Sequence, residues 1–152
     1  MSDVPRCILL GEDSKVFARA HEIALRKAGY EVMFAGDGFA VLEAARTNQP
    51  DLIVLDLMLP KLQGQTVLRE LKKDPLTSRI PVIIYSGLPQ QNESRLRRAG
   101  AVSYLQKNRI TSDDFLSAVS EVFAAERSKR DTAACHEYWA EFMTVAPRPV
   151  IV

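Results

Sequence analysis

The stretch LIVLDLMLPKLQG, residues 52–64, decides how the rest of the sequence is interpreted. Its first residues, 52–55, form an apolar run typical of a short strand that is buried on both faces. Asp56 follows at the end of that strand, and further apolar residues and Pro60 come after it. An ionised carboxylate beside so much apolar surface is costly unless a partner stabilises it. The stretch therefore raises the question of what Asp56 binds.

Strand-like and helix-like segments alternate on both sides of this stretch. Apolar runs predict strands at 7–10, 30–35, 52–55, 81–85 and 102–106. Capping residues and helical spacing predict helices from Ser14 to Gly29, after Asp37, over 65–73, over 90–99 and after Thr111 or Ser112. This alternation predicts an α/β fold with a doubly wound, five-stranded parallel sheet and helices on both faces.

Three of the predicted helices carry apolar residues at helical spacing, as amphipathic helices do. In the first helix these residues are Val16, Phe17, Ala20, Ile23 and Ala24. In the helix over 65–73 the inward residues are expected to be Val67, Leu68 and Leu71. In the last helix the apolar stripe consists of Phe115, Leu116, Val119, Val122 and Phe123.

Length and composition favour one soluble domain with a short appendage. The chain has 152 residues, which suits a domain over 1–127 and a C-terminal extension over 128–152. Lysine and arginine number 20 against 19 acidic residues, so charge gives no reason to expect nucleic-acid binding, and the extension is too short for a DNA-binding domain. No apolar run approaches the roughly 20 residues that span a bilayer. With no signal-peptide pattern and no metal-binding spacing of cysteines, we expect a reduced, cytoplasmic protein away from the membrane.

The predicted strand ends carry one kind of chemistry. Glu12 and Asp13 follow the first strand, Asp56 the third, Ser86 the fourth and Lys107 the fifth. In open parallel sheets, ligands bind beyond the carboxyl ends of the strands, where these side chains would meet. Close carboxylates repel one another and need a cation, and oxygen ligands favour Mg²⁺. Asp56 then has the character of a nucleophile that accepts a phosphoryl group, with the hydroxyl and the ammonium placed to bind phosphoryl oxygens.

Four stretches in this order resemble a known family. GEDS at 11–14, LIVLDLMLPKLQG at 52–64, PVIIYSG at 81–87 and YLQK at 104–107 are similar to the response-regulator receiver domain of two-component signalling. The resemblance implies the strand order 2-1-3-4-5. It also implies a phosphodonor that is a histidine kinase or a histidine phosphotransfer protein, and an unknown downstream protein as the target.

The resemblance assigns a role to each matching residue. Asp56 would be the phosphoacceptor, and Ser86 the switch hydroxyl that moves toward the phosphoryl group. Lys107 would pair with the phosphate, and Tyr104 would be the aromatic residue that turns inward when Ser86 moves, although a half-buried strand residue is the alternative. The magnesium ion would be held by Asp13 directly, Glu12 through water, Asp56 and the backbone carbonyl of Met58. Phosphorylation would then change a surface around the fourth helix, the fifth strand and the fifth helix.

The sequence departs from the family pattern after Lys107, where a proline is usual and Asn108 stands instead. A cis bond before a residue other than proline costs about 2.5–4 kcal/mol, which favours a trans bond and leaves the aim of Lys107 open. Met58 and Leu88 each lie two residues after a site residue, and neither can orient a water molecule by a strong hydrogen bond. We therefore expect the phosphoryl group to be lost slowly.

Two other classes use similar elements. A phosphatase of the haloacid-dehalogenase type also has an aspartate nucleophile after a strand, but it needs a second acid at the position that Met58 occupies. A flavodoxin-like cofactor binder would need a glycine-rich phosphate loop after the first strand, and none is present there.

The extension has a second apolar stripe, formed by Cys135, Tyr138, Trp139, Phe142 and Met143. If the last helix continued unbroken, this stripe would be rotated by roughly 200° from the first one. Either the helix breaks around 128–132 and a short helix folds back over the domain, or the aromatic residues contact a second copy of the chain or another protein. The terminal PVIV could add to a sheet edge of this chain or of a partner, or remain disordered.

Overall fold

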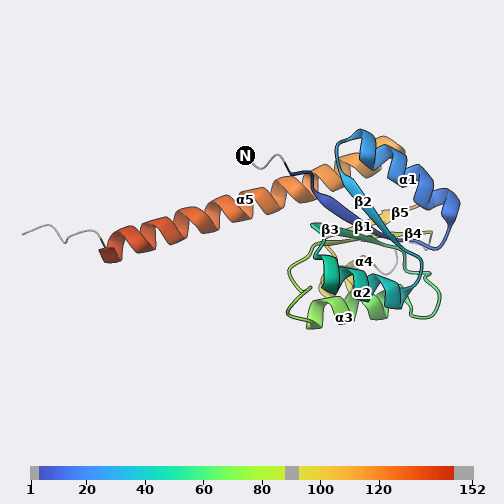
Figure 1. Ribbon diagram of the computed structural model, residues 1–152, viewed down its shortest axis with the longest axis horizontal. Helices are drawn as coiled ribbons and strands as arrows, with labels where there is room; N and C mark the ends of the chain where they lie inside the picture. Colours follow the sequence, from blue (N-terminus) through green and yellow to red (C-terminus); the bar gives the residue numbers. More distant parts are fainter. Residues whose placement is uncertain (1–3, 88–92, 146–152) are drawn as a thin grey trace, which may run out of the picture. The chain divides into compact units, whose positions relative to one another are not determined.

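The computed structural model describes residues 4–87 and 93–145, with side chains described as far as Lys129. Within these residues, parallel strands form a sheet in the order β2-β1-β3-β4-β5 (Figure 1). The strands are β1 (Cys7–Gly11), β2 (Glu31–Ala35), β3 (Leu52–Leu55), β4 (Val82–Ser86) and β5 (Ser103–Gln106). The predicted doubly wound fold and its strand order are confirmed.

Helices connect the strands and cover both faces of the sheet. They are α1 (Lys15–Lys27), α2 (Gly38–Asn48), α3 (Gly64–Lys73), α4 (Glu93–Arg98) and α5 (Ser112–Val145). Figure 1 shows α1 on one side of the sheet and α2 and α3 on the other. The helix predicted over 90–99 is described only from Glu93, because residues 88–92 lie outside the described part of the chain.

Local capping sets where three helices begin. Ser14 and Asp37 each accept a hydrogen bond from the backbone N–H three residues on, at 3.5 and 2.8 Å, as predicted. At α5 the cap is Thr111, whose Oγ1 accepts from the backbone of Asp114 at 3.1 Å. The Asp114 carboxylate in turn accepts from the backbone N–H of Thr111 at 3.0 Å, which completes a capping box.

A hydrophobic core lies between the sheet and the α2–α3 side. All residues of β3 are buried, and Ile53 and Leu55 belong to this core together with Val67, Leu68 and Leu71 of α3. The predicted inward face of α3 is therefore confirmed. Burial on both faces explains why β3 reads as a continuous apolar run rather than an alternating one.

The apolar repeat of α1 does not mark the face that is buried. Val16, Phe17 and Ile23 are 79%, 40% and 43% exposed, whereas Leu25 is fully buried. His21 takes an inward position instead, packed against aromatic rings. The interpretation from spacing was wrong here because an imidazole flanked by aromatic partners occupies the place that periodicity assigns to aliphatic side chains.

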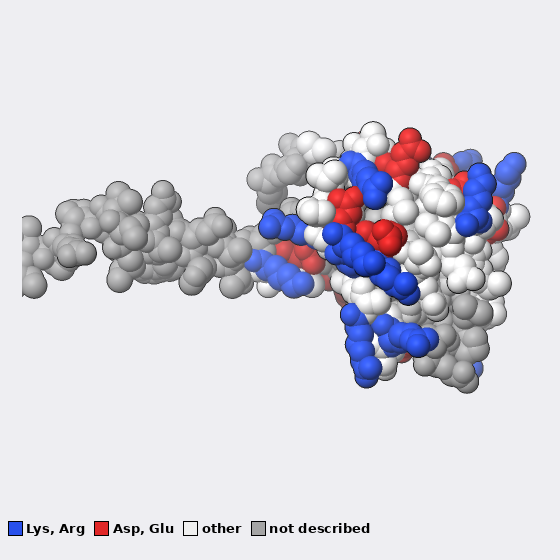
Figure 2. Space-filling model, turned by 90° about the horizontal axis from the view of Figure 1, so that it is seen from below, with Lys and Arg blue, Asp and Glu red and all other residues white. Residues whose placement is uncertain are grey.

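Charges on the outer surface are mixed. Figure 2 shows Lys and Arg side chains interleaved with Asp and Glu on the face seen from below the view of Figure 1. Ion pairs at the surface include Arg46–Asp74, at 2.6 Å, and Lys73–Glu70, at 3.9 Å. Mixed charge on this face agrees with the near-neutral composition.

The chain divides into two compact units, residues 1–118 and 119–152. The division falls within α5, which is helical without interruption from Ser112 to Val145. Of the two alternatives for the extension, a helix break around 128–132 is not found, and the predicted domain boundary after residue 127 stays a prediction. The terminal PVIV lies outside the described residues. In the part of the chain that is described, no helix is both long and apolar enough to cross a bilayer.

Candidate functional site

Three carboxylates meet at the carboxyl ends of β1 and β3. One oxygen each from Glu12, Asp13 and Asp56 lies within 4.8 Å of the others. The sheet register causes this, because Gly11 of β1 pairs with Leu55 of β3, so the residues that follow each strand emerge side by side. Asp56 is 5% exposed, and Asp13 is exposed. The prediction that these acids converge is confirmed.

Lys107 reaches across the sheet edge and bridges two of these carboxylates. Its Nζ donates to Glu12 Oε2 at 2.6 Å and to Asp56 Oδ2 at 2.7 Å. Its backbone N–H donates to the carbonyl oxygen of Ser86 at 2.9 Å, which attaches the residue to the end of β4. The bond from Lys107 to Asn108 is trans, since the described residues contain no cis peptide bond. The missing proline therefore does not turn the ammonium away from the acidic cluster.

Burial and pairing shape the electrostatics of this bridge. Burial would lower the pKa of Lys107, but its hydrogen bonds to Asp56 and Glu12 outweigh that effect, and its pKa lies above the ordinary value. Burial raises the pKa of Glu12, and the nearby charge of Asp56 adds to this, although the hydrogen bond from Lys107 opposes it. Lys107 thus stays charged and partly neutralises a cluster of acids that would otherwise repel one another.

The other predicted residues surround the cluster at different depths. Ser86 is fully buried at the end of β4, and Tyr104 is 4% exposed and belongs to the hydrophobic core. Met58 is 63% exposed, and its backbone N–H donates to Asp56 Oδ1 at 3.0 Å. Leu88 lies outside the described residues. Tyr104 is therefore already directed inward in this structure, rather than half-buried.

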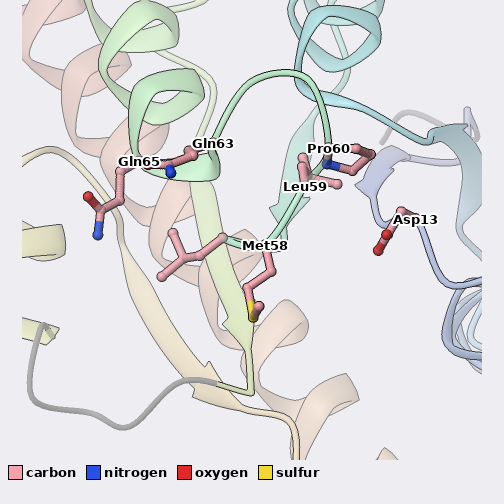
Figure 3. A pocket seen from close by; sticks show the side chains of 7 residues that line it. Asp13, Met58, Leu59, Pro60, Gln63 and Gln65 are labelled. Carbon is pink, nitrogen blue, oxygen red and sulfur yellow. The ribbon is translucent and has the colours of Figure 1, made fainter.

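An open pocket lies beside the acidic cluster (Figure 3). Its volume is about 470 Å³, and Asp13 and residues 57–60 line it together with Gln63 and Gln65. Figure 3 shows Met58 between Asp13 on one side and the two glutamines at the start of α3 on the other. The pocket thus opens onto Asp13 of the acidic cluster, next to the Met58 side chain.

An aromatic cluster that the sequence analysis did not identify adjoins Lys107. The Lys107 Nζ lies 4.7 Å from the centroid of the Phe17 ring and 5.6 Å from that of Tyr85. The His21 ring lies 4.7 Å from Tyr85 and 4.5 Å from Phe115, both in edge-to-face geometry. No motif or spacing links these residues, since they come from α1, β4 and α5 and meet only through tertiary packing.

The donor set fits a hard divalent cation. The acids supply carboxylate oxygens that lie close enough together to share one ion, and oxygen ligands are those that Mg²⁺ prefers. The exposed Asp13 and the adjoining pocket leave room for the waters that Mg²⁺ usually keeps. The chemistry of the residues is therefore consistent with Mg²⁺ binding.

Comparison with known proteins agrees with this geometry. The family model described as the response regulator receiver domain matches residues 8–120. The chain is 40% identical over 105 residues to the DNA-binding dual master transcriptional regulator RpaA of Synechocystis sp., covering 68% of this chain and 43% of RpaA. It is 30% identical over 105 residues to the polar-differentiation response regulator DivK of Brucella anthropi, covering 68% of this chain and 85% of DivK. The chain thus spans less than half of RpaA but most of DivK.

Solved structures show the same similarity. A putative response regulator from Chloroflexus aurantiacus has a TM-score of 0.74 at 29% identity, covering 80% of this chain and 99% of that one. The receiver domain of the sensor histidine kinase PA1611 from Pseudomonas aeruginosa has a TM-score of 0.70 at 28% identity, covering 78% of this chain and 97% of that one. The latter crystal structure has a magnesium ion coordinated in its active-site cleft. The match over residues 8–120, the strand order and the acidic cluster together show that this chain belongs to the response regulator receiver domain family of two-component signalling.

Proposed function

We propose that this protein is a phosphorylation-dependent switch in which Asp56 accepts a phosphoryl group from a histidine kinase or a histidine phosphotransfer protein. The observation that carries the proposal is the meeting of three carboxylates and the Lys107 ammonium at one edge of the sheet. Lys107 binds both Glu12 and Asp56, and of the three acids Asp56 is the most deeply buried, at 5% exposed. The open pocket is lined by Asp13 of the acidic cluster and by Leu57 and Met58, the two residues that follow Asp56.

In the proposed step, a carboxylate oxygen of Asp56 attacks the phosphorus of a phosphohistidine. The new O–P bond forms while the P–N bond breaks, and the histidine nitrogen leaves with the electron pair and takes up a proton. Glu12, Asp13, Asp56 and the backbone carbonyl of Met58 would hold Mg²⁺. A bound Mg²⁺ supplies positive charge that offsets repulsion between these acids and the anionic donor.

Lys107 and Ser86 would act on the transferred group. Lys107 now donates to Asp56 Oδ2, so a short movement would let its ammonium bind a phosphoryl oxygen. The Ser86 hydroxyl would donate to another oxygen from the end of β4. Positioning and charge neutralisation by such groups provide most of the catalysis in phosphoryl transfer.

The output would be a change in a protein-binding surface around α4, β5 and α5, rather than chemistry on a separate substrate. In this proposal, movement of Ser86 toward the phosphoryl group is coupled to the position of Tyr104, which is buried in this structure. We further propose that the protein acts in the cytoplasm. The downstream partner would be a protein, and the extension over 128–152 would contact a second copy of the chain.

Phosphorylation with a small donor tests the proposal. The full chain is incubated with acetyl phosphate or phosphoramidate and Mg²⁺, and its intact mass is measured. We expect an adduct of one phosphoryl group that is absent from Asp56→Asn and present in Asp51→Asn, a control at the other end of β3. An adduct on Asp56→Asn would overturn the assignment. Catalytic turnover of phosphate esters would instead favour a phosphatase of the haloacid-dehalogenase type, against which the presence of Met58 argues.

A further inference from the structure

Lys107 is held by more than its two carboxylate partners. Its ammonium lies 4.7 Å from the Phe17 ring centroid and 5.6 Å from that of Tyr85, within the range of about 6 Å at which a cation is attracted to an aromatic face. The Lys107 side chain is 10% exposed, so these contacts act where water screens them little. Four groups, from α1, from β4 and from the loops after β1 and β3, thus contact one ammonium.

The backbone alone does not account for this placement. Lys107 precedes Asn108 rather than a proline, and the bond between them is trans. The hydrogen bond to Ser86 attaches only the main chain. The ammonium lies at the end of a flexible four-carbon side chain that can adopt many rotamers. The main-chain hydrogen bond therefore does not fix the ammonium beside Asp56.

His21 contacts both Phe17 and Tyr85. Its Nδ1–H, in the tautomer that this contact requires, donates to the carbonyl oxygen of Phe17 at 2.6 Å. Its ring packs edge-on against Tyr85 and Phe115, at 4.7 and 4.5 Å. Burial lowers the pKa of His21, and the charge of Lys107 lowers it further, which favours the neutral ring. Because the neutral imidazole carries no charge, it does not repel the Lys107 ammonium.

We propose that Phe17 and Tyr85 are positioning residues that hold the Lys107 ammonium against Asp56 and thereby speed its phosphorylation. The inference rests on the proposed function of Asp56, but the contact itself can be measured without phosphorylation. The proposal also predicts different effects on phosphoryl transfer and on Mg²⁺ binding, because Lys107 and a bound cation share Glu12 and Asp56 as partners. Loosening Lys107 slows phosphoryl transfer without weakening Mg²⁺ binding, whereas general damage to the site weakens both.

The kinetic test uses the full chain with matched substitutions. Phe17→Leu and Tyr85→Leu remove a ring, while Phe17→Tyr and Tyr85→Phe keep it, and Phe39→Leu removes a ring from an exposed position elsewhere. We expect the rate of phosphorylation by acetyl phosphate at saturating Mg²⁺ to fall roughly three- to tenfold in the two ring-removing variants at the site. The ring-keeping variants and Phe39→Leu should stay near the wild-type rate. The Mg²⁺ dissociation constant, from an NMR titration of backbone amides, should be unchanged or lower in the slow variants.

A second measurement reports the contact directly. In metal-free wild-type protein, the Cε protons of Lys107 should be shifted upfield by the two rings, and the shift should shrink in each leucine variant. Absence of this shift in the wild type overturns the inference even if a leucine variant fails to fold. Slow phosphorylation accompanied by weaker Mg²⁺ binding also overturns it. An adduct that persists in Asp56→Asn would instead remove the proposed function, while the shift of Lys107 would remain.

Discussion

The backbone of Gly64 lies directly against that of Asp56. A β-carbon at Gly64 would stand 2.5 Å from the carbonyl oxygen of Asp56 and 2.5 Å from the Cα of Leu57. The Gly64 N–H also donates to the carbonyl oxygen of Leu57 at 3.0 Å. The first residue of α3 therefore packs directly against the loop that carries the candidate phosphoacceptor, and only glycine fits there without a shift of the backbone.

Replacing Gly64 with alanine should damage both stability and the site. Because the added methyl group would collide with backbone rather than with a flexible side chain, we expect the free energy of unfolding to fall by about 2–3 kcal/mol. Phosphorylation of Asp56 should slow as well, since the loop must shift. Urea unfolding followed by circular dichroism measures the first effect. Gly36→Ala is the control, because a β-carbon there meets nothing within 4 Å; an equal loss in both variants would contradict the argument.

Lys107→Ala should make stability depend on metal. The change leaves Glu12 and Asp56, whose side chains are 8% and 6% exposed, without their common partner. We expect the metal-free protein to lose about 2–4 kcal/mol of unfolding free energy, because unpaired buried charges are costly. Millimolar Mg²⁺ should restore much of the loss, and should bind more tightly than to wild type, since a competing cation is gone.

A surface pair serves as the control for this measurement. Lys73 lies 3.9 Å from Glu70, and the two side chains are 67% and 42% exposed. Lys73→Ala should change stability by less than about 1 kcal/mol and show no dependence on Mg²⁺. If Lys107→Ala also changed stability by less than about 1 kcal/mol and without dependence on Mg²⁺, the ion pairs of Lys107 with Glu12 and Asp56 would not stabilise the fold.

Stability should fall below neutral pH through His21. Burial lowers its pKa in the folded protein, whereas the unfolded chain titrates near 6.5. Between these two values the unfolded state binds more protons, so stability present above pH 6.5 decreases as the pH falls through this window. The pKa of Glu12 is raised in the folded protein, so the effect of Glu12 on stability has the opposite sign: stability rises as the pH falls toward the ordinary pKa of a glutamate. This effect is the same in wild type and in a His21 variant. Unfolding midpoints from pH 8 to about pH 5 should therefore drop less for His21→Phe than for wild type, and parallel curves would contradict the prediction.

Met58→Asn should shorten the lifetime of the phosphorylated protein. Met58 is 63% exposed beside Asp56, and a thioether cannot orient an attacking water by a strong hydrogen bond, whereas an amide can. We expect slow loss of the phosphoryl group from wild type and a loss roughly tenfold faster from the variant, less than the roughly 10²–10⁴-fold of general acid–base catalysis because an amide orients the water but does not take its proton. The measurement is the decay of the intact-mass adduct in magnesium buffer. Loss from wild type within seconds would show that Met58 gives no protection.

Deletion of residues 131–152 tests the role proposed for the extension. The helix continues without a break to Val145, and its sequence carries a second apolar stripe at Cys135, Tyr138, Trp139, Phe142 and Met143. We expect the full chain to have the mass of a dimer in solution and the truncated chain that of a monomer, by light scattering. An identical monomer in both cases would remove the dimer and leave the extension as a docking segment for another protein.

Local pattern predicted the strands and the acids at their ends, and the family resemblance supplied the strand order. Apolar runs predicted every strand to within about a residue at either end, and parallel strands must leave their following residues at one edge. Asp56 directly follows one such run, and Glu12 and Asp13 come two and three residues after another. Their meeting therefore follows from the parallel strands and from the order that makes β1 and β3 neighbours, without knowledge of any side-chain contact.

Other features could not be predicted because they depend on which surfaces face one another. The rotation of α1 about its axis turns His21 inward and leaves Val16 exposed, which the spacing of apolar residues did not indicate. The bridge from Lys107 to two acids and its contact with Phe17 combine residues that are far apart in the chain. Such contacts depend on helix orientation and on the complementary shapes of distant segments. Periodicity along the sequence carries little information about either, so only the folded arrangement could reveal how the ammonium is held.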